Sequence, residues 1–326
     1  MNLSDAYVAR LIAIARAYYL DNATQADIAR MFNLSRSMVS RDLTLAREIG
    51  IVEISIRDPR QRTPGYQDRL RNRFPQLIDA VIAPTFSEEP DALRATLGRF
   101  AANYLLAALK PGQRLALGCG RTLRAMIDSL PSKLIPAVEV VQAMGNIGHE
   151  AHGIDYNEIA RQAANALGGR VYYLSAPAIL GQRAGTARAF TEANPTLSHA
   201  LALAKAADIY VVGLGSLESD QLYAQAGLIE PQELEAVRDQ AVGDICGHFF
   251  DLNGTPVFTP FHDRIVGITL EDLRHAAITI GVAGGLDKVE PLIGALRGGY
   301  INVVVSDERT IALLLERLDV IEQTVN

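Results

Sequence analysis

The amino-acid sequence predicts an α/β protein with two parts, a small helical head and a larger domain built on a parallel sheet. Three observations support this fold class. The chain has 326 residues, more than one typical domain needs. Residues 24–49 show helical periodicity broken by a turn signal. From about residue 77, short apolar runs alternate with helical stretches, which is the pattern of a parallel sheet covered on both faces.

The composition is that of an ordinary globular protein, with 49% hydrophobic and 21% charged residues. No apolar run approaches the roughly 18 residues of a spanning helix, and the first ten residues lack the regions of a secretion signal. Cys119 and Cys246 are too distant in sequence to indicate a disulfide framework. We therefore expect a cytoplasmic protein without membrane contact.

Charge is unevenly distributed along the chain. Residues 1–75 contain twelve arginines and eight acidic residues, a net charge of +4, whereas the whole chain carries −6. The remaining residues therefore carry −10. A basic front of the chain, residues 1–75, before an acidic remainder indicates that this front alone meets a polyanion.

The head is expected to begin with a helix over 7–20, followed by a shorter helix whose N-cap is Thr24. Ile28 and Ala29 give that second helix its apolar face. Asn33 then stands where a tight turn needs a residue that tolerates positive φ.

A third helix is expected after Ser35, with Val39, Leu43 and Ala46 on its buried side. The layout is that of a helix-turn-helix, whose recognition helix enters the major groove of DNA, and residues 50–56 alternate like the strand of a wing. The alternative is a small helical cap or a dimerisation module. The candidate DNA-binding residues, which could bond base edges or phosphates, are Thr24, Gln25, Ser35, Arg36, Ser37, Ser40 and Arg41.

The chain divides into a predicted winged helix-turn-helix domain over 1–57, a linker over 58–76 and an α/β domain over 77–326. The linker begins with proline, glycine and arginine, which favour an extended connection. Strands are expected over 78–83, 114–117, 138–143, 171–174, 208–213, 277–282 and 301–305. Helices are expected over 68–74, 91–109, 121–130, 155–167, 196–206, 231–240, 286–296 and 307–318.

Glycine-rich loops follow four of the expected strands. They read "GCGRT", "MGNIGHEAHGID", "GLGSL" and "AGGLDK". Ligands of such sheets bind at the carboxyl ends of strands, glycine lets backbone amides approach them, and helix N-termini favour anions. "GCGRTL" lacks the third glycine of a dinucleotide fingerprint, and the sequence contains no phosphate-binding loop of the nucleotide triphosphatases. A small phosphorylated ligand remains.

Metal and cofactor sites are not expected. His149 and His152 lie near Glu150 in a glycine-rich loop, but nothing fixes a third ligand or a frame for a metal. His262 beside Asp263 reads as a structural hydrogen bond. Cys119 would need a nearby base to act as a nucleophile.

Several long motifs in both parts resemble the SorC family of bacterial sugar-responsive transcriptional regulators. They include "TQADIARMFNLSRSMVSRDL" in the head and "GNIGHEAHGIDYNEIARQAANALGG", "AVGDICGHFFDLNG" and "VAGGLDKVEPLIGALRGGYINVVVSDE" in the body. The resemblance covers almost the whole sequence. Asp42 departs from it, because the family usually has an apolar residue there; it flanks the buried face, and we expect it to pair with an arginine of the head.

The resemblance implies a winged helix-turn-helix joined to a Rossmann-like effector domain similar to glucosamine-phosphate deaminases and ribose-phosphate isomerases. It also implies homo-oligomers, namely tetramers, on operator DNA and a phosphorylated sugar or polyol as effector. Together with the strand-end loops, it gives the candidate effector-binding residues Gly118, Gly120, Arg121, Thr122, Gly145, Asn146, Gly213, Gly215, Asp244 and Lys288.

The predicted function is therefore sequence-specific regulation of a carbohydrate-utilisation operon without catalysis. The alternative is a sugar-phosphate isomerase-like or deaminase-like enzyme with an accessory helical head, which would need a carboxylate base with a tuned pKa. The acidic candidates Asp155, Glu158, Asp220, Asp244 and Asp287 stand in no recognisable catalytic frame. The sequence leaves open which sugar binds and whether it favours or opposes DNA binding.

Overall fold

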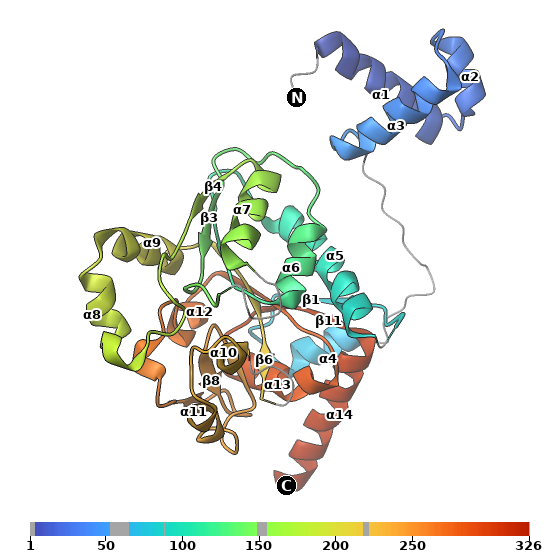
Figure 1. Ribbon diagram of the computed structural model, residues 1–326. Helices are drawn as coiled ribbons and strands as arrows, with labels where there is room; N and C mark the ends of the chain where they lie inside the picture. Colours follow the sequence, from blue (N-terminus) through green and yellow to red (C-terminus); the bar gives the residue numbers. More distant parts are fainter. Residues whose placement is uncertain (1–3, 53–64, 88, 149–154, 218–221, 326) are drawn as a thin grey trace. The chain divides into compact units, whose positions relative to one another are not determined.

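A computed structural model describes residues 4–52, 65–87, 89–148, 155–217 and 222–325 (Figure 1). The chain divides into two compact units, a head and a body that begins at residue 61, and each is treated by itself. The expected wing strand over 50–56 lies mostly outside the described residues. No helix in the described part of the chain is long and apolar enough to span a membrane.

The described part of the head contains three helices, α1 (Asp5–Tyr19), α2 (Gln25–Met31) and α3 (Arg36–Glu48). Thr24 caps α2 in a reciprocal arrangement with Asp27. Ser35 caps α3 by accepting a hydrogen bond of 3.2 Å from the Met38 amide. Asn33 joins α2 to α3 at a φ of 53°, as the turn required.

The three helices of the head pack around a small apolar core. It contains the expected Ile28, Ala29, Val39 and Leu43, together with Ile14 of α1. Burial of these residues on one side of each helix leaves the opposite side of α3 to solvent.

Asp42 occupies a buried position on α3 and is only 3% exposed. Its carboxylate forms an ion pair of 3.1 Å with Arg10 and accepts a hydrogen bond of 2.9 Å from the Tyr7 hydroxyl. The Arg10 guanidinium also lies 4.5 Å from the centre of the Tyr7 ring. The expected partnership of Asp42 with a head arginine is therefore present, and it ties α3 to α1.

The body is built on a parallel sheet of seven strands within the described residues. The spatial order is β1–β11–β10–β5–β2–β3–β4, and every neighbouring pair is parallel. The strands are β1 (Asp79–Ala83), β2 (Arg114–Leu117), β3 (Glu139–Gln142), β4 (Arg170–Tyr172), β5 (Ile209–Gly213), β10 (Ile278–Val282) and β11 (Val303–Asp307). All seven strands that the sequence predicts belong to this sheet.

The strand order reverses between β2 and β5. From β2 the chain proceeds outward through β3 and β4, and it then returns to β5 and proceeds the other way through β10 to β11. Crossovers of one hand then place helices on opposite faces of the sheet, so that α6 (Arg121–Asp128) and α7 (Tyr156–Leu167) oppose α13 (Val289–Arg297) (Figure 1). Such a switch point leaves a crevice at the carboxyl ends of its two central strands.

Further helices complete the two layers. α5 (Pro90–Ala108) packs against α6 on one side of the sheet, whereas α14 (Glu308–Val325) packs against α13 and α4 (Tyr66–Arg73). The remaining helices are α8 (Ala187–Glu192), α9 (Pro195–Lys205), α10 (Leu222–Gln225), α11 (Pro231–Glu235) and α12 (Leu270–Arg274). The helix predicted over 231–240 ends at Glu235, and residues 236–240 form turns.

A small antiparallel sheet, which the sequence analysis did not predict, adjoins the switch point. Its strands are β6 (Gly215–Ser216), β7 (Gly243–Ile245), β8 (His248–Phe250) and β9 (Pro256–Val257). Cys246 and Gly247 join β7 to β8 at φ values of 51° and 81°, which is the two-residue turn that fits the twist of a hairpin. This hairpin brings Asp244 and Cys246 to the crevice.

Candidate functional site

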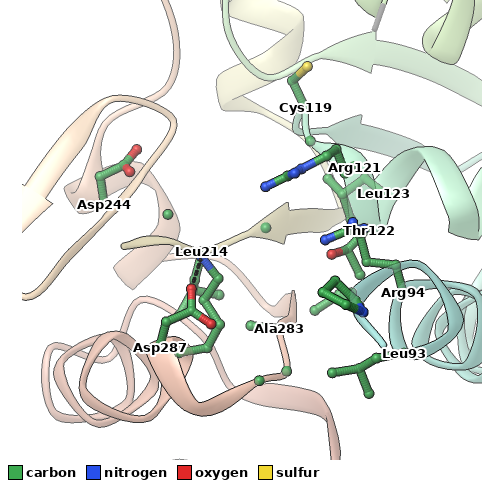
Figure 2. A pocket seen from close by; sticks show the side chains of 18 of the residues that line it. Leu93, Arg94, Cys119, Arg121, Thr122, Leu123, Leu214, Asp244, Ala283 and Asp287 are labelled. Carbon is green, nitrogen blue, oxygen red and sulfur yellow. Dashed lines mark ion pairs between the residues drawn. The ribbon is translucent and has the colours of Figure 1, made fainter. Parts of the chain in front are cut away.

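A cavity of about 520 Å³ occupies the crevice at the carboxyl ends of β2, β5 and β10. Figure 2 shows Arg121 and Thr122 on one side of it and Asp244 and Asp287 on the other. Its lining therefore combines cationic, anionic and apolar groups. Such a mixture suits a small ligand with one anionic end and several hydroxyl groups.

The cationic side begins at the N-terminus of α6. Gly120 precedes this helix at a φ of +144°, a conformation that L side chains rarely adopt. No side chain in the described part of the chain caps α6, and a Cβ at Gly120 would meet none of its described atoms within 4 Å. The first turn of α6 therefore lines the cavity through Arg121 and Thr122 without a side-chain cap, and such a helix N-terminus is a favourable place for an anion.

The acidic side is centred on Asp244, which is 8% exposed. One carboxylate oxygen accepts hydrogen bonds of 3.0 Å from the Tyr223 hydroxyl and 2.9 Å from the Gly247 amide. Burial and the nearby Asp244 raise the pKa of Tyr223 well above its ordinary value. A Cβ at Gly215 would lie 1.9 Å from the other oxygen of Asp244, so glycine at 215 makes room for this carboxylate.

Lys288 and Asp287 form an ion pair of 3.0 Å at the start of α13. Asp287 also accepts a hydrogen bond of 3.0 Å from the Ser216 hydroxyl, which connects α13 to the small sheet. The Lys288 side chain is only 12% exposed. Burial and the ion pair with Asp287 therefore hold the Lys288 ammonium group in place in the wall of the cavity.

The loop between β10 and α13 is held by contacts with the end of β11 and the start of α14. The Gly285 amide donates hydrogen bonds to Asp307 at 3.3 Å and to the Thr310 hydroxyl at 2.8 Å. A Cβ at Gly284 would lie 2.5 Å from the same Asp307 carboxylate. Close approach between this loop and β11 therefore explains one of the glycines that the sequence places at a strand end.

Both cysteines line the cavity, but neither is an activated thiol. Burial raises the pKa of Cys119 to about 12, and burial with the nearby Asp244 raises that of Cys246 as well. The neutral thiol is the unreactive form. These groups shape the wall of the cavity.

Seven of the ten candidate effector-binding residues line this cavity, namely Gly120, Arg121, Thr122, Gly213, Gly215, Asp244 and Lys288. Gly118 and Gly145 lie outside its lining and serve packing: a Cβ would lie 3.2 Å from the Val211 oxygen at Gly118 and 2.5 Å from the Pro177 oxygen at Gly145. Asn146 instead lines a second cavity of about 650 Å³, whose described lining contains no charged residue.

The cavity also contains residues that were not among the predicted effector-binding residues, although Asp287 was considered as an acidic candidate for catalysis. Arg94 and Leu93 of α5 form part of its wall, and Tyr223 and Asp287 contribute polar groups. Asp287 directly precedes Lys288 in the "GGLDK" motif, so the motif could have indicated it as a residue of the site. Arg94 and Tyr223 lie in stretches that resemble ordinary helices, and nothing in their sequence context indicated a site.

The candidate DNA-binding residues lie at the start of α2 and on α3. Arg36, Ser37, Ser40 and Arg41 are exposed on α3, whereas the hydroxyls of Thr24 and Ser35 cap their helices. Gln25 opens α2 and is half-buried. Both arginines are therefore open to solvent, and Arg41 lies on the side of α3 opposite Val39 and Leu43.

Metal-binding clusters of three or more His, Cys, Asp or Glu residues do not occur among the described residues. His149, Glu150 and His152 lie outside that part of the chain. His262 stacks edge-on against His248, with ring centres 5.4 Å apart, and against Phe258 at 4.7 Å. Its environment is aromatic packing.

The fold and the cavity define an α/β ligand-binding protein with a helical head. The family model described as "Putative sugar-binding domain" matches residues 59–316. The chain is 31% identical to the deoxyribonucleoside regulator of Bacillus subtilis (strain 168), over 94% of this chain and 97% of that protein. It is 32% identical to the transcriptional regulator LsrR of Escherichia coli (strain K12), over 93% of each.

A solved structure extends this similarity to both parts of the chain. The full-length sorbitol operon regulator SorC from Klebsiella pneumoniae matches with a TM-score of 0.74 at 28% identity, covering 96% of this chain and 100% of that one. The protein belongs to the SorC family of sugar-binding transcriptional regulators.

Proposed function

We propose that this protein is a sequence-specific DNA-binding regulator of a carbohydrate-utilisation operon, and that a phosphorylated sugar or polyol controls its binding to the operator. The observation that carries the proposal is the cavity, which places an uncapped helix N-terminus and cationic side chains opposite a buried carboxylate. The relatives named as transcriptional regulators support the DNA-binding half of the proposal.

The head is proposed to be a winged helix-turn-helix with α3 as its recognition helix. Arg36 and Arg41 are exposed on α3, where their guanidinium groups could bond guanine edges or phosphates. The tight turn at Asn33 and the buried ion pair of Asp42 with Arg10 of α1 fix the orientation of α3 relative to the other two helices of the head. Residues 1–75 also carry a net charge of +4, which favours contact with DNA.

The effector is proposed to bind with its phosphate at the N-terminus of α6 and its hydroxyl groups toward Asp244. A phosphate is favoured by the backbone amides and by Arg121 and Thr122. The Asp244 carboxylate accepts hydrogen bonds and is suited to sugar hydroxyls. Lys288 adds a compact positive charge to the cavity.

Binding without turnover is proposed on the names of the relatives, and two of the five candidate acids, Asp155 and Glu158, agree with it. Asp155 caps α7, accepting a hydrogen bond of 2.9 Å from the Asn157 amide. Arg161 holds the pKa of Glu158 below its ordinary value, whereas a general base should have a pKa near neutrality. Asp220 lies outside the described residues.

Regulation is proposed to follow from linkage in a homo-oligomer, for which we propose a tetramer. The effector must bind one arrangement of the subunits better than another, and the operator must show its own preference between them. If the two prefer different arrangements, the effector releases the operator. If they prefer the same arrangement, the effector strengthens operator binding.

The test is fluorescence anisotropy of labelled DNA from upstream of the protein's own gene, titrated at fixed salt. The titration is repeated with phosphorylated sugars and polyols and with their unphosphorylated parents. We expect specific binding that one phosphorylated compound shifts. Absence of specific DNA binding, together with conversion of a panel compound, would refute the regulator and favour an enzyme.

A further inference from the structure

A second arginine reaches the same side of the cavity as Arg121. Arg94 lies near the start of α5 and lines the cavity together with Pro90 and Leu93. Its side chain is 21% exposed. The role of this group follows from how α5 packs on α6.

The backbones of α5 and α6 are in direct contact at one point. A Cβ at Gly98 would lie 2.5 Å from the carbonyl carbon of Ala125 and 2.7 Å from the Met126 amide nitrogen. Both helices follow strands of the parallel sheet, so both begin at its carboxyl edge and run in the same direction.

Arg94 and Arg121 therefore occupy equivalent positions on the two helices, and both line the cavity. Arg94 precedes Gly98 by four residues, and Arg121 precedes Ala125 by four residues, about one helical turn in each case. The two arginines thus stand one turn before the contact, at the carboxyl edge of the sheet. Figure 2 shows both of them, with Thr122, on the side of the cavity opposite Asp244.

The Arg94 guanidinium keeps donors available to a ligand. Its Nη2 and Nε atoms donate to one carboxylate oxygen of Asp91, at 2.6 Å and 3.2 Å. Nη1 has no hydrogen-bond partner among the residues that the structure describes. Asp91 is 84% exposed, so it orients the guanidinium from the solvent side without filling the cavity.

We propose that Arg94 and Arg121, together with the first backbone amides of α6, form an arginine clamp for the phosphomonoester group of the effector. This inference rests on the proposed function and assigns Arg94 as a specificity-determining residue. Two guanidinium groups and a helix N-terminus supply three separate sets of donors. They match the three terminal oxygens of a phosphate better than the two oxygens of a carboxylate.

The experiment is isothermal titration calorimetry on the full-length protein and on Arg94→Gln, Arg94→Lys and Arg99→Gln. Arg99 lies on the same helix and is exposed, so it matches the change in charge without touching the cavity. The probes are glucose, glucose 6-phosphate, gluconate and gluconate 6-phosphate, together with sorbitol and ribose, their phosphates, and inorganic phosphate.

We expect Arg94→Gln to weaken binding of the phosphorylated probe by roughly tenfold to a hundredfold, the range of a charge-assisted hydrogen bond. Arg94→Lys should fall between it and the wild type, because lysine keeps the charge without the fork. Arg99→Gln should bind like the wild type. If circular dichroism shows that Arg94→Gln does not fold, the affinity of Arg94→Lys relative to the wild type tests the role of Arg94 instead.

The contrary outcomes separate the two proposals. Unchanged affinity of both Arg94 variants for a phosphorylated compound that the wild type binds would refute the clamp and leave the proposed function standing. Equal binding of gluconate and its phosphate would refute the assignment to a phosphate group. A wild type that binds specific DNA but no probe would refute the phosphorylated effector, and the clamp with it.

Discussion

Asp244, which we propose binds the hydroxyl groups of the effector, is a buried carboxylate held in place by its neighbours. Tyr223 and Gly247 hold one of its oxygens, and the absence of a side chain at Gly215 leaves room for the other. The carboxylate is thus fixed before a ligand arrives, which lowers the entropy cost of binding. We therefore expect the residues around Asp244 to influence effector affinity as well as the carboxylate itself.

Gly215→Ala tests this arrangement. The new Cβ would lie 1.9 Å from the Asp244 oxygen, so the carboxylate must leave its place. We expect effector affinity to fall at least about tenfold and stability to drop by about 1–3 kcal/mol, the usual cost of overpacking. Calorimetry and chemical denaturation measure the two effects. Gly181→Ala is the control, because a Cβ there would meet no described atom within 4 Å. Wild-type effector affinity in Gly215→Ala would contradict the proposed binding of the effector by Asp244.

Lys288→Ala tests the cationic group next to the small sheet. We expect the effector to lose its influence on operator binding while the affinity for operator DNA without effector stays the same. Anisotropy titrations with and without effector measure both quantities. Lys110→Ala, at an exposed position of the same domain, should behave like the wild type. Loss of operator binding in Lys288→Ala would mean that the Lys288–Asp287 pair is structural.

At the scale of elements, the contact of α5 with α6 connects packing to the site. The two helices touch through backbone atoms at Gly98, and their first turns form the cationic wall of the cavity. Any residue larger than glycine at 98 must separate the helices, because backbone atoms cannot move aside as a flexible side chain does.

Gly98→Ala is therefore expected to lower both stability and effector affinity. The free energy of unfolding should fall by about 1–3 kcal/mol, and the affinity for the phosphorylated effector should fall more than that for its unphosphorylated parent. Thermal denaturation and calorimetry provide the two measurements. Arg99→Ala, one residue further along α5, is the matched control. A stable Gly98→Ala variant with normal affinity would show that the helices can separate without cost.

The elements also show what the sequence can predict. The seven strands of the parallel sheet were predictable because each is a short apolar run between helical stretches. The small sheet was not, since strands of two or three residues such as Gly215–Ser216 are too short to show a period. The helix predicted over 231–240 ends early, because a local pattern does not reveal where tertiary packing stops a helix.

The site was predictable to the extent that its residues follow strands. Gly120, Arg121 and Lys288 come shortly after the ends of β2 and β10, and the parallel sheet brings those strand ends to one edge. Arg94 could not be distinguished from Arg99, because both stand in one amphipathic helix and only the approach of α6 at Gly98 decides which faces the cavity. Gly145 and Asn146 matched a family motif, yet Gly145 packs closely against Pro177 and Asn146 lines the second cavity.

For the whole molecule, the proposal gives the head and the body separate tasks, namely DNA binding and effector binding. Arg41→Ala removes one exposed guanidinium from α3, and we expect it to weaken operator binding by about 1–3 kcal/mol if Arg41 contacts a base. Effector binding to the body, followed by calorimetry, should remain normal. Unchanged operator affinity would remove Arg41 from the DNA-reading surface of α3.

Linkage between the two tasks gives the most general prediction. If the effector changes operator affinity by some factor, the operator must change effector affinity by the same factor, because both binding reactions share one thermodynamic cycle. We therefore expect the ratio of effector dissociation constants, measured with and without saturating operator duplex, to equal the ratio from operator titrations with and without effector. Lys288→Ala should bring both ratios to one. Unequal ratios at a fixed oligomer concentration would mean that the effector acts by changing the assembly of the subunits. The titrations are therefore repeated at two protein concentrations. A change in assembly depends on protein concentration, whereas a conformational change within one oligomer does not.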